Sequence, residues 1–131
     1  MKITVDTNIL VRAVVRDNEQ QALIADTALK EAALLAVSLP CLCEFVWVLR
    51  RVYGFDNAAI AAAIRALIAT EKVAANRHAV EAGLLILEAG GDFADGVMAY
   101  EGSWLGGETF VSFDKKAVSL LARQGQMARL P

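Results

Sequence analysis

The chain has 131 residues and a formal net charge of −2, and hydrophobic residues make up 56% of it. This length favours one domain over two, so we expect a single domain over residues 1–131. The charge argues against a protein that holds nucleic acid by bulk neutralisation of phosphates, because such proteins carry a clear basic excess. The apolar fraction exceeds what a domain of this size needs to bury, so we expect an apolar surface that contacts a partner or a second copy.

The start of the chain, MKITVDTN, has the pattern of a strand and lacks the apolar region of a secretory leader. The longest apolar stretch, residues 34–49, is interrupted by Pro40 and Glu44 and is too short to span a bilayer. Cys41 and Cys43 are too close in sequence for an unstrained disulfide, and a single histidine does not favour a zinc site. We therefore expect a soluble, cytoplasmic protein with reduced cysteines and no membrane association.

Short strands alternate with longer helices along the chain. The expected strands are residues 2–5, 34–38, 72–75 and 109–113, of which 109–113 (TFVSF) has the strongest strand pattern. The first expected helix ends near residue 15, and the others cover about 19–33, 40–53, 57–70, 77–89, 93–105 and 115–123. Gly54 is a natural helix stop and Asp56 a natural cap. Because strands separated by helices form parallel sheets, the sequence predicts a three-layer α/β/α domain, a short parallel sheet flanked by helices.

Four aspartates lie next to expected element ends. Asp6 and Asp114 each follow an expected strand, and side chains at the carboxyl ends of parallel strands gather at one edge of a sheet. Each also precedes a helix that it can cap, so a site role and a capping role both stay open. Asp92 and Asp95 open another helix together. Asp92 is the better cap, whereas Asp95 leads into an apolar helix face and should stay near the sheet.

Glu44 lies within the sequence CLCEFVWVL, in the middle of a helix that we expect to be largely buried. The residues three and four positions away carry no opposite charge, so the helix itself offers no ion pair. A glutamate that leaves water without a partner costs several kcal/mol or becomes protonated. Three explanations stay open: a cation shared with other carboxylates, a basic side chain from elsewhere, or exposure to solvent.

The candidate catalytic residues are Asp6, Glu44, Asp95 and Asp114, and in one pocket they would repel each other. At ~5 Å and an effective dielectric of ~20, each pair costs roughly 3 kcal/mol, so a divalent cation would be needed to keep them ionised. Carboxylate oxygens suit Mg²⁺ or Mn²⁺ and not zinc. One or two such ions can bind a scissile phosphate, activate an attacking water and stabilise the leaving oxygen.

Four sequence blocks resemble the PIN-domain family, and the match is closest to its VapC-type toxins from bacterial toxin–antitoxin pairs. The blocks are Val-Asp-Thr-Asn at 5–8, Glu44 within Glu-Phe-Val-Trp-Val-Leu, Asp92-Phe-Ala-Asp95-Gly-Val-Met-Ala, and Phe110-Val-Ser-Phe-Asp114. They span essentially all 131 residues. Their order within an α/β pattern makes the resemblance specific.

The resemblance implies an endoribonuclease that depends on Mg²⁺ or Mn²⁺. By it, Asp6 and Asp95 are direct metal ligands, and Asp114 is a ligand to a second or shared ion. Glu44 is a ligand or positions the attacking water. Supporting roles fall to polar residues that brace the carboxylates: Asn8 and Ser112, with Asp92 a ligand or a helix cap.

The resemblance also implies a homodimer that acts on RNA and is kept inactive by a cognate antitoxin protein. The apolar excess of the chain is consistent with such partners. Two positions depart from the family pattern, because Gly96 stands where a larger apolar residue or alanine is usual and Ser112 where threonine is common. Neither departure removes a carboxylate.

Two other functions compete with the ribonuclease. One is a catalytically inactive PIN-like binding or scaffold module, although all four carboxylates are present. The other is a phosphoacceptor receiver domain, which would need an adjacent acidic pair after the first strand, and Asp6 has none. His78 lies away from every motif, and we expect core or dimer packing for Trp47 and Trp104. The cations best placed for phosphate are Lys115 and Lys116, with Arg12, Arg16, Arg50 and Arg51 as further candidates.

Overall fold

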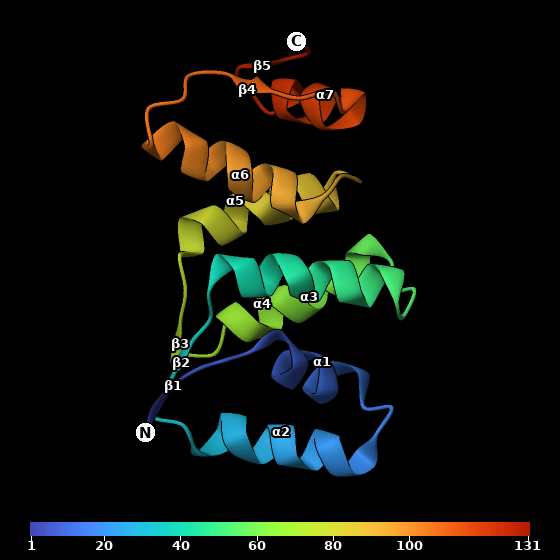
Figure 1. Ribbon diagram of the computed structural model, residues 1–131, viewed down its shortest axis with the longest axis vertical. Helices are drawn as coiled ribbons and strands as arrows, with labels where there is room; N and C mark the ends of the chain where they lie inside the picture. Colours follow the sequence, from blue (N-terminus) through green and yellow to red (C-terminus); the bar gives the residue numbers. More distant parts are fainter. The chain divides into compact units, whose positions relative to one another are not determined.

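The computed structural model describes residues 1–131 and contains seven helices and five short strands (Figure 1). The helices are α1 (Thr7–Val15), α2 (Glu19–Glu31), α3 (Leu39–Arg51), α4 (Asn57–Ile68), α5 (Arg77–Glu88), α6 (Phe93–Trp104) and α7 (Lys115–Arg123). The strands are β1 (Lys2–Thr4), β2 (Leu34–Ala36), β3 (Val73–Ala74), β4 (Phe110–Val111) and β5 (Ala128–Arg129). The chain forms two compact units, Met1–Asn76 and Arg77–Pro131.

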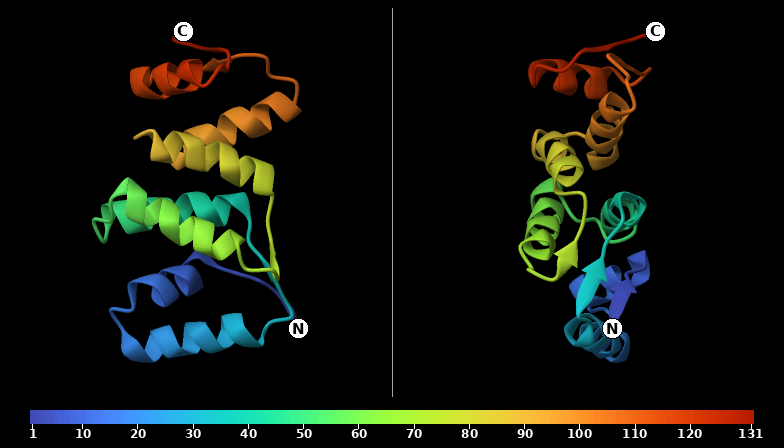
Figure 2. Two further views of the ribbon diagram at one scale, coloured as in Figure 1. Left: turned by 180° about the vertical axis from the view of Figure 1, so that it is seen from behind. Right: turned by 90° about the vertical axis from the view of Figure 1, so that its left-hand side faces the viewer.

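The first unit is built on a three-stranded parallel sheet in the order β1-β2-β3. Thr4, the last residue of β1, pairs with Ala36, the last residue of β2. Asp6 and Ser38 each follow two residues later, so the chain leaves both strands at the same edge of the sheet and enters α1 and α3 there. Within this unit α1 and α2 lie side by side, joined by a short loop (Figure 2).

Helix ends in the first unit carry the signals that the sequence predicts. Asp56 caps α4, because its carboxylate accepts a hydrogen bond of 2.8 Å from the backbone N–H of Ala59. Gly54 adopts a φ of 69°, a left-handed conformation that glycine adopts without the steric cost of a Cβ. Ser38 caps α3 in the same way, accepting from the backbone N–H of Cys41 at 3.2 Å.

The second unit is built from α5, α6 and α7 with the two-stranded parallel sheet β4-β5. A small core holds α5, α6 and α7 together, with Ile86, Ala99, Leu120 and Leu121 buried at its centre. The helices α5 and α6 pack closely along their length (Figure 1).

The predicted mixed α/β fold with a short parallel sheet flanked by helices is confirmed, and every strand pair is parallel. Each of the four predicted strands is shorter in the structure, and a fifth strand, β5, was not predicted. The expected strand 109–113 is reduced to Phe110–Val111, because its partner β5, which we did not predict, offers only Ala128 and Arg129 for pairing. The organisation of the chain as one domain stays a prediction. No helix is both long and apolar enough to cross a bilayer.

Candidate active site

Asp6 and Glu44 line the same pocket, which has a volume of about 370 Å³ and lies where the chain leaves β1 and β2. Asp6 comes from the start of α1, and Glu44 lies in the second turn of α3. The other lining residues are Thr4, Val5, Thr7, Ser38, Pro40 and Cys41. The structure therefore brings together two of the four predicted catalytic carboxylates within the first unit.

The side chain of Asp6 is not used as a helix cap. Asp6 occupies the cap position of α1, with an extended backbone, yet its carboxylate accepts no capping hydrogen bond. The side chain is exposed at the mouth of the pocket. Of the two roles that the sequence left open for this residue, capping is therefore wrong, and the carboxylate is available to a ligand.

Of the three explanations that the sequence leaves open for Glu44, the structure shows exposure to solvent. Glu44 is exposed, on a stripe of α3 that also carries Pro40, Trp47 and Arg51. These residues are spaced by three or four positions, which places them on one side of a helix. Trp47 is 58% exposed, so it is not a core residue of the chain itself. The case for Glu44 now rests on its shared pocket with Asp6, because exposure to solvent removes the burial argument.

Sequence reasoning missed two residues of this pocket, Thr7 and Cys41, which are both buried and line it. Burial raises the pKa of the Cys41 thiol, the hydrogen bond from Thr7 lowers it, and the charges of Asp6 and Glu44 raise it further. The signal was present in the sequence, because Thr7 directly follows Asp6 and Cys41 precedes Glu44 by three residues on one helix.

In the second unit, the charges of Asp92 and Asp114 both act on Asp95. Asp114 caps α7 and accepts a hydrogen bond of 3.1 Å from the backbone N–H of Ala117. Asp92 caps α6 through the backbone N–H of Ala94 at 3.3 Å. The capping role that the sequence favoured for Asp92 is thus observed. Asp114 also caps a helix, through one of its two carboxylate oxygens.

Asp95 lies in the first turn of α6 and is half-buried. Burial, the charge of Asp92 and the charge of Asp114, in that order, raise the pKa of Asp95 from 3.8 to about 6. Carboxyl groups whose surroundings raise their pKa in this way are typical of functional sites. A cation near Asp95 would favour its ionised form, so the electrostatics of the cluster suit a positively charged ligand.

The departure at Gly96 has a packing reason. A Cβ at this position would lie 2.4 Å from the carbonyl oxygen of Ala82 and 2.8 Å from the Cα of Gly83. Gly83 in turn faces the ring of Phe93, which a Cβ would approach to 2.7 Å. The backbones of α5 and α6 therefore cross at a distance that only glycine permits, immediately beside Asp95.

The two predicted supporting residues lie in different surroundings. The hydroxyl of Ser112 accepts a hydrogen bond of 3.0 Å from the backbone N–H of Asp114, and so braces the turn that carries this carboxylate. Asn8 lines a separate pocket of about 340 Å³ between α1 and α2, beside Arg12. Within the first unit, Asn8 is thus not gathered with Asp6 and Glu44.

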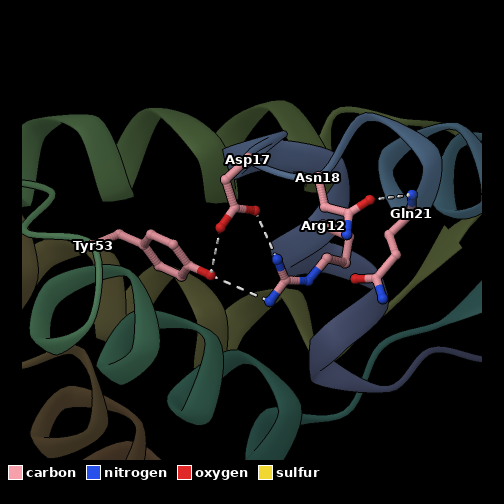
Figure 3. A network of polar contacts seen from close by, with 5 residues as sticks. All are labelled: Arg12, Asp17, Asn18, Gln21 and Tyr53. Atoms are coloured by element: carbon pink, nitrogen blue, oxygen red, sulfur yellow. Dashed lines mark hydrogen bonds and ion pairs between the residues drawn. The ribbon is translucent and has the colours of Figure 1, made fainter.

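Two of the cations proposed for phosphate contact are engaged in ion pairs. Arg12 pairs with Asp17 at 2.7 Å and donates to the hydroxyl of Tyr53 at 3.2 Å (Figure 3). The same hydroxyl donates to the other oxygen of Asp17 at 3.3 Å, which closes the network. Arg16 pairs with Asp26 at 2.9 Å. These arginines support the loop between α1 and α2.

The donor chemistry of the carboxylates fits a divalent metal, because oxygen ligands are those that Mg²⁺ and Mn²⁺ prefer. Asp6 and Glu44 offer such oxygens in one pocket, and Asp95 with Asp114 in the other unit. No group of three or more His, Cys, Asp or Glu side chains lies close enough together to hold a metal ion in the structure.

Comparison with protein families gives a match to the PIN domain over residues 3–119. The matched segment includes Asp6, Glu44, Asp95 and Asp114, and it extends across both compact units. No curated protein and no solved structure matches the chain.

Proposed function

We propose that this chain, which belongs to the PIN domain family, is a Mg²⁺- or Mn²⁺-dependent endoribonuclease and the toxin of a type II toxin–antitoxin system. PIN domains are generally nucleases, and they typically bind divalent metals. The choice of RNA as substrate, the metal requirement of this chain and the toxin role are our proposal.

The single observation that carries the proposal is the family match over residues 3–119, which contains all four predicted catalytic carboxylates. Two local features support it. Asp6 and Glu44 share one pocket, and Asp6 is free of any capping bond. Burial, followed by the charges of Asp92 and Asp114, raises the pKa of Asp95 to about 6.

We assign Asp6 and Asp95 as direct metal ligands, Asp114 as a ligand to a second or shared ion, and Glu44 as a ligand or the group that orients the attacking water. When bound, the metal would supply charge stabilisation for the phosphate and would lower the pKa of the water. The side chains of the protein would hold their positions around it: Asp114 through its bond to the α7 backbone, and Asp6 without one.

The test is cleavage of a defined RNA panel with Mn²⁺ or Mg²⁺, with and without EDTA. We expect cleavage that EDTA abolishes and that Asp6→Asn reduces by at least about 100-fold, because a ligand to the metal is lost. Glu31→Gln is the matched control, since it removes one exposed negative charge from the same unit and should leave the rate unchanged. If Asp6→Asn cleaves RNA at the wild-type rate, the proposed site is refuted. A wild-type protein that neither cleaves RNA nor binds metal would favour the scaffold alternative.

A second measurement asks whether the assigned carboxylates of each unit bind the metal. Mn²⁺ is paramagnetic and broadens the NMR signals of nearby nuclei. We expect it to broaden the amide signals next to Asp6 and Glu44 and those next to Asp95 and Asp114. Signals that stay sharp next to either pair would contradict the assignment of that pair as metal ligands.

We also propose a homodimer and a cognate antitoxin as the protein partners. Large apolar side chains that remain exposed support an interface, among them Leu23, Ile24, Trp47, Trp104 and Leu105. Light scattering of the purified chain would give its oligomeric state, and a small reading frame directly upstream would identify an antitoxin to co-express. A strictly monomeric chain at high concentration would contradict the dimer.

A further inference from the structure

A stripe of exposed side chains runs along α3 from the Asp6–Glu44 pocket towards the end of the helix. Its members are all exposed and are spaced by three or four positions: Pro40, Glu44, Trp47 and Arg51. Pro40 and Glu44 line the pocket itself. At roughly 1.5 Å per residue, Trp47 lies about 4.5 Å and Arg51 about 10.5 Å beyond Glu44 along the helix axis. The α3 stripe is therefore continuous with the pocket.

The indole ring of Trp47 has no partner within the chain. Its side chain is 58% exposed and makes no hydrogen bond and no contact with another ring. The other tryptophan, Trp104, is also exposed but lies beside Tyr100, with the two ring centroids 6.4 Å apart. A large ring that remains in water and contacts no other ring offers a surface on which a flat ligand can stack.

The neighbours of Trp47 on the helix are mostly charged. One turn before it lies Glu44, and one turn after it lie Arg50 and Arg51. Arg50 donates to the side chain of Asn57 at 2.6 Å, whereas Arg51 is exposed and makes no ion pair. The centres of protein interfaces are depleted of charged residues, glutamate among them. An aromatic ring beside an unpaired cation instead matches surfaces for single-stranded nucleic acid, on which bases stack on rings and phosphates contact basic side chains.

We propose that Trp47 and Arg51 bind single-stranded RNA beside the pocket: an unpaired base stacks on Trp47, and a phosphate contacts Arg51. This rests on the proposed ribonuclease function and adds its substrate class, because a base within a duplex is already stacked and paired and cannot reach the ring. The formal net charge of −2 means that phosphates must be held by local cations, and Arg51 is one. The protein interface proposed above does not need Trp47, because other large apolar side chains are exposed: Leu23, Ile24, Trp104 and Leu105.

The test uses the fluorescence of the two tryptophans, each of which can be observed alone. Trp104→Phe leaves Trp47 as the only indole, and Trp47→Phe leaves Trp104. Both proteins are titrated at low salt with an unpaired RNA oligonucleotide and with the same sequence in a perfect duplex. EDTA is present, so that no metal-dependent cleavage occurs. We expect the single strand to quench Trp47, the duplex to leave it unchanged at the same concentration, and neither RNA to quench Trp104.

The second readout is the affinity for the labelled single strand, measured by fluorescence anisotropy. Trp47→Ala removes the ring and should weaken binding about tenfold, within the range for loss of one stacked base. Trp47→Phe keeps an aromatic face and should bind nearly as tightly as wild type. Trp47→Leu keeps an apolar side chain without a ring and should bind as weakly as Trp47→Ala. Arg51→Gln should weaken binding and reduce its dependence on salt, because one phosphate contact is lost.

Two variants are matched controls for these substitutions. Trp104→Ala removes the other exposed tryptophan. Arg123→Gln removes an exposed arginine from the last turn of α7, as Arg51→Gln does from the last turn of α3. Neither control residue belongs to the α3 stripe, so we expect wild-type affinity for RNA in both.

The proposal is overturned if Trp47→Ala or Trp47→Leu binds the single strand as tightly as wild type, or if the duplex quenches Trp47 equally. It is also overturned if Trp47→Ala changes the oligomeric state in light scattering and leaves RNA affinity unchanged, which would assign the stripe to a protein interface. A wild type that binds the single strand through Trp47 but cleaves no RNA with Mn²⁺ would refute the proposed function and leave the binding surface intact. Cleavage that does not depend on Trp47 would refute the surface alone, so the two failures are distinguishable.

Discussion

In the unit Met1–Asn76, Asp6 accepts no capping hydrogen bond and Glu44 is exposed, whereas in the unit Arg77–Pro131 both Asp92 and Asp114 cap helices. The first pair therefore depends on the packing of the helices that carry it. The second group is held directly by backbone N–H groups at the starts of α6 and α7. Side chains of one chemical type can thus be placed either by their own bonds or by the backbone beneath them.

The two capping aspartates of the second unit affect the ionisation of a third carboxyl group, that of Asp95. Asp92 and Asp114 each accept one capping hydrogen bond, and their charges add to the effect of burial on the pKa of Asp95. The close crossing at Gly96 also fixes the backbone next to Asp95. Of the two acidic regions, the one in the second unit is thus the one in which neighbouring carboxylates raise the pKa of a third.

The largest effect should come from opening the α5–α6 crossing. Gly96→Ala places a Cβ 2.4 Å from the carbonyl oxygen of Ala82, so the backbones must separate, and we expect a loss of about 3 kcal/mol of stability. Gly102→Ala is the control on the same helix, because a Cβ there meets nothing within 4 Å. That variant should gain up to about 1 kcal/mol. Urea unfolding of both proteins measures the difference.

Equal stability of Gly96→Ala and Gly102→Ala would show that the crossing is not held at the observed distance. In that case the backbone next to Asp95 would be free to move, and the contrast between the two acidic regions would be lost.

The fold could be predicted from the sequence where local signals are strong. The cap at Asp56 and the turn at Gly54 were read correctly because each depends on a few neighbouring residues. Strand β5 was missed because Ala128 and Arg129 have no apolar alternation, and only pairing with β4 makes them a strand. The predicted length of β4 was wrong for the same reason, because the partner strand decides how many residues of an apolar run form strand hydrogen bonds.

The candidate site was predictable in its residue types but not in how each residue is held. The sequence could not separate the capping Asp114 from the uncapped Asp6, because both precede a helix in the same way. For Glu44 the sequence left exposure and burial with a partner both open, because its helix is apolar almost throughout. The spacing of Glu44, Trp47 and Arg51 marks the exposed stripe, and only tertiary packing decides that it is the stripe left uncovered.

A smaller effect should separate Asp114 from Asp6 directly. Asp114→Ala removes the acceptor for the backbone N–H of Ala117 and should cost about 1 kcal/mol of stability. Asp6→Ala removes no such bond and should cost clearly less. Unfolding in urea with EDTA present compares the two variants without any contribution from bound metal. A cost for Asp6→Ala that equals that of Asp114→Ala would mean that Asp6 caps α1 in solution.

The smallest effect concerns the charge of Asp95 in the metal-free protein. Its pKa is about 6 in the folded chain against an ordinary value of 3.8, so between these values the folded state binds more protons than the unfolded state. The stability that this protonation contributes is therefore complete below about pH 4 and is lost as the pH rises through about 6. Because Asp95 is only half-buried, we expect a contribution of about 1 kcal/mol at most.

Asp95→Asn cannot ionise at this position and should lack that loss. The measurement is the difference in unfolding free energy between wild type and Asp95→Asn in EDTA, followed from about pH 4 to about pH 7. The other carboxylates are present in both proteins, so their contributions to the unfolding free energy largely cancel in the difference. The stability of Asp95→Asn relative to wild type should therefore increase as the pH rises through 6. A difference that stays constant over this range would mean that burial and the charges of Asp92 and Asp114 do not raise the pKa of Asp95, and the contrast between the two acidic regions would be lost.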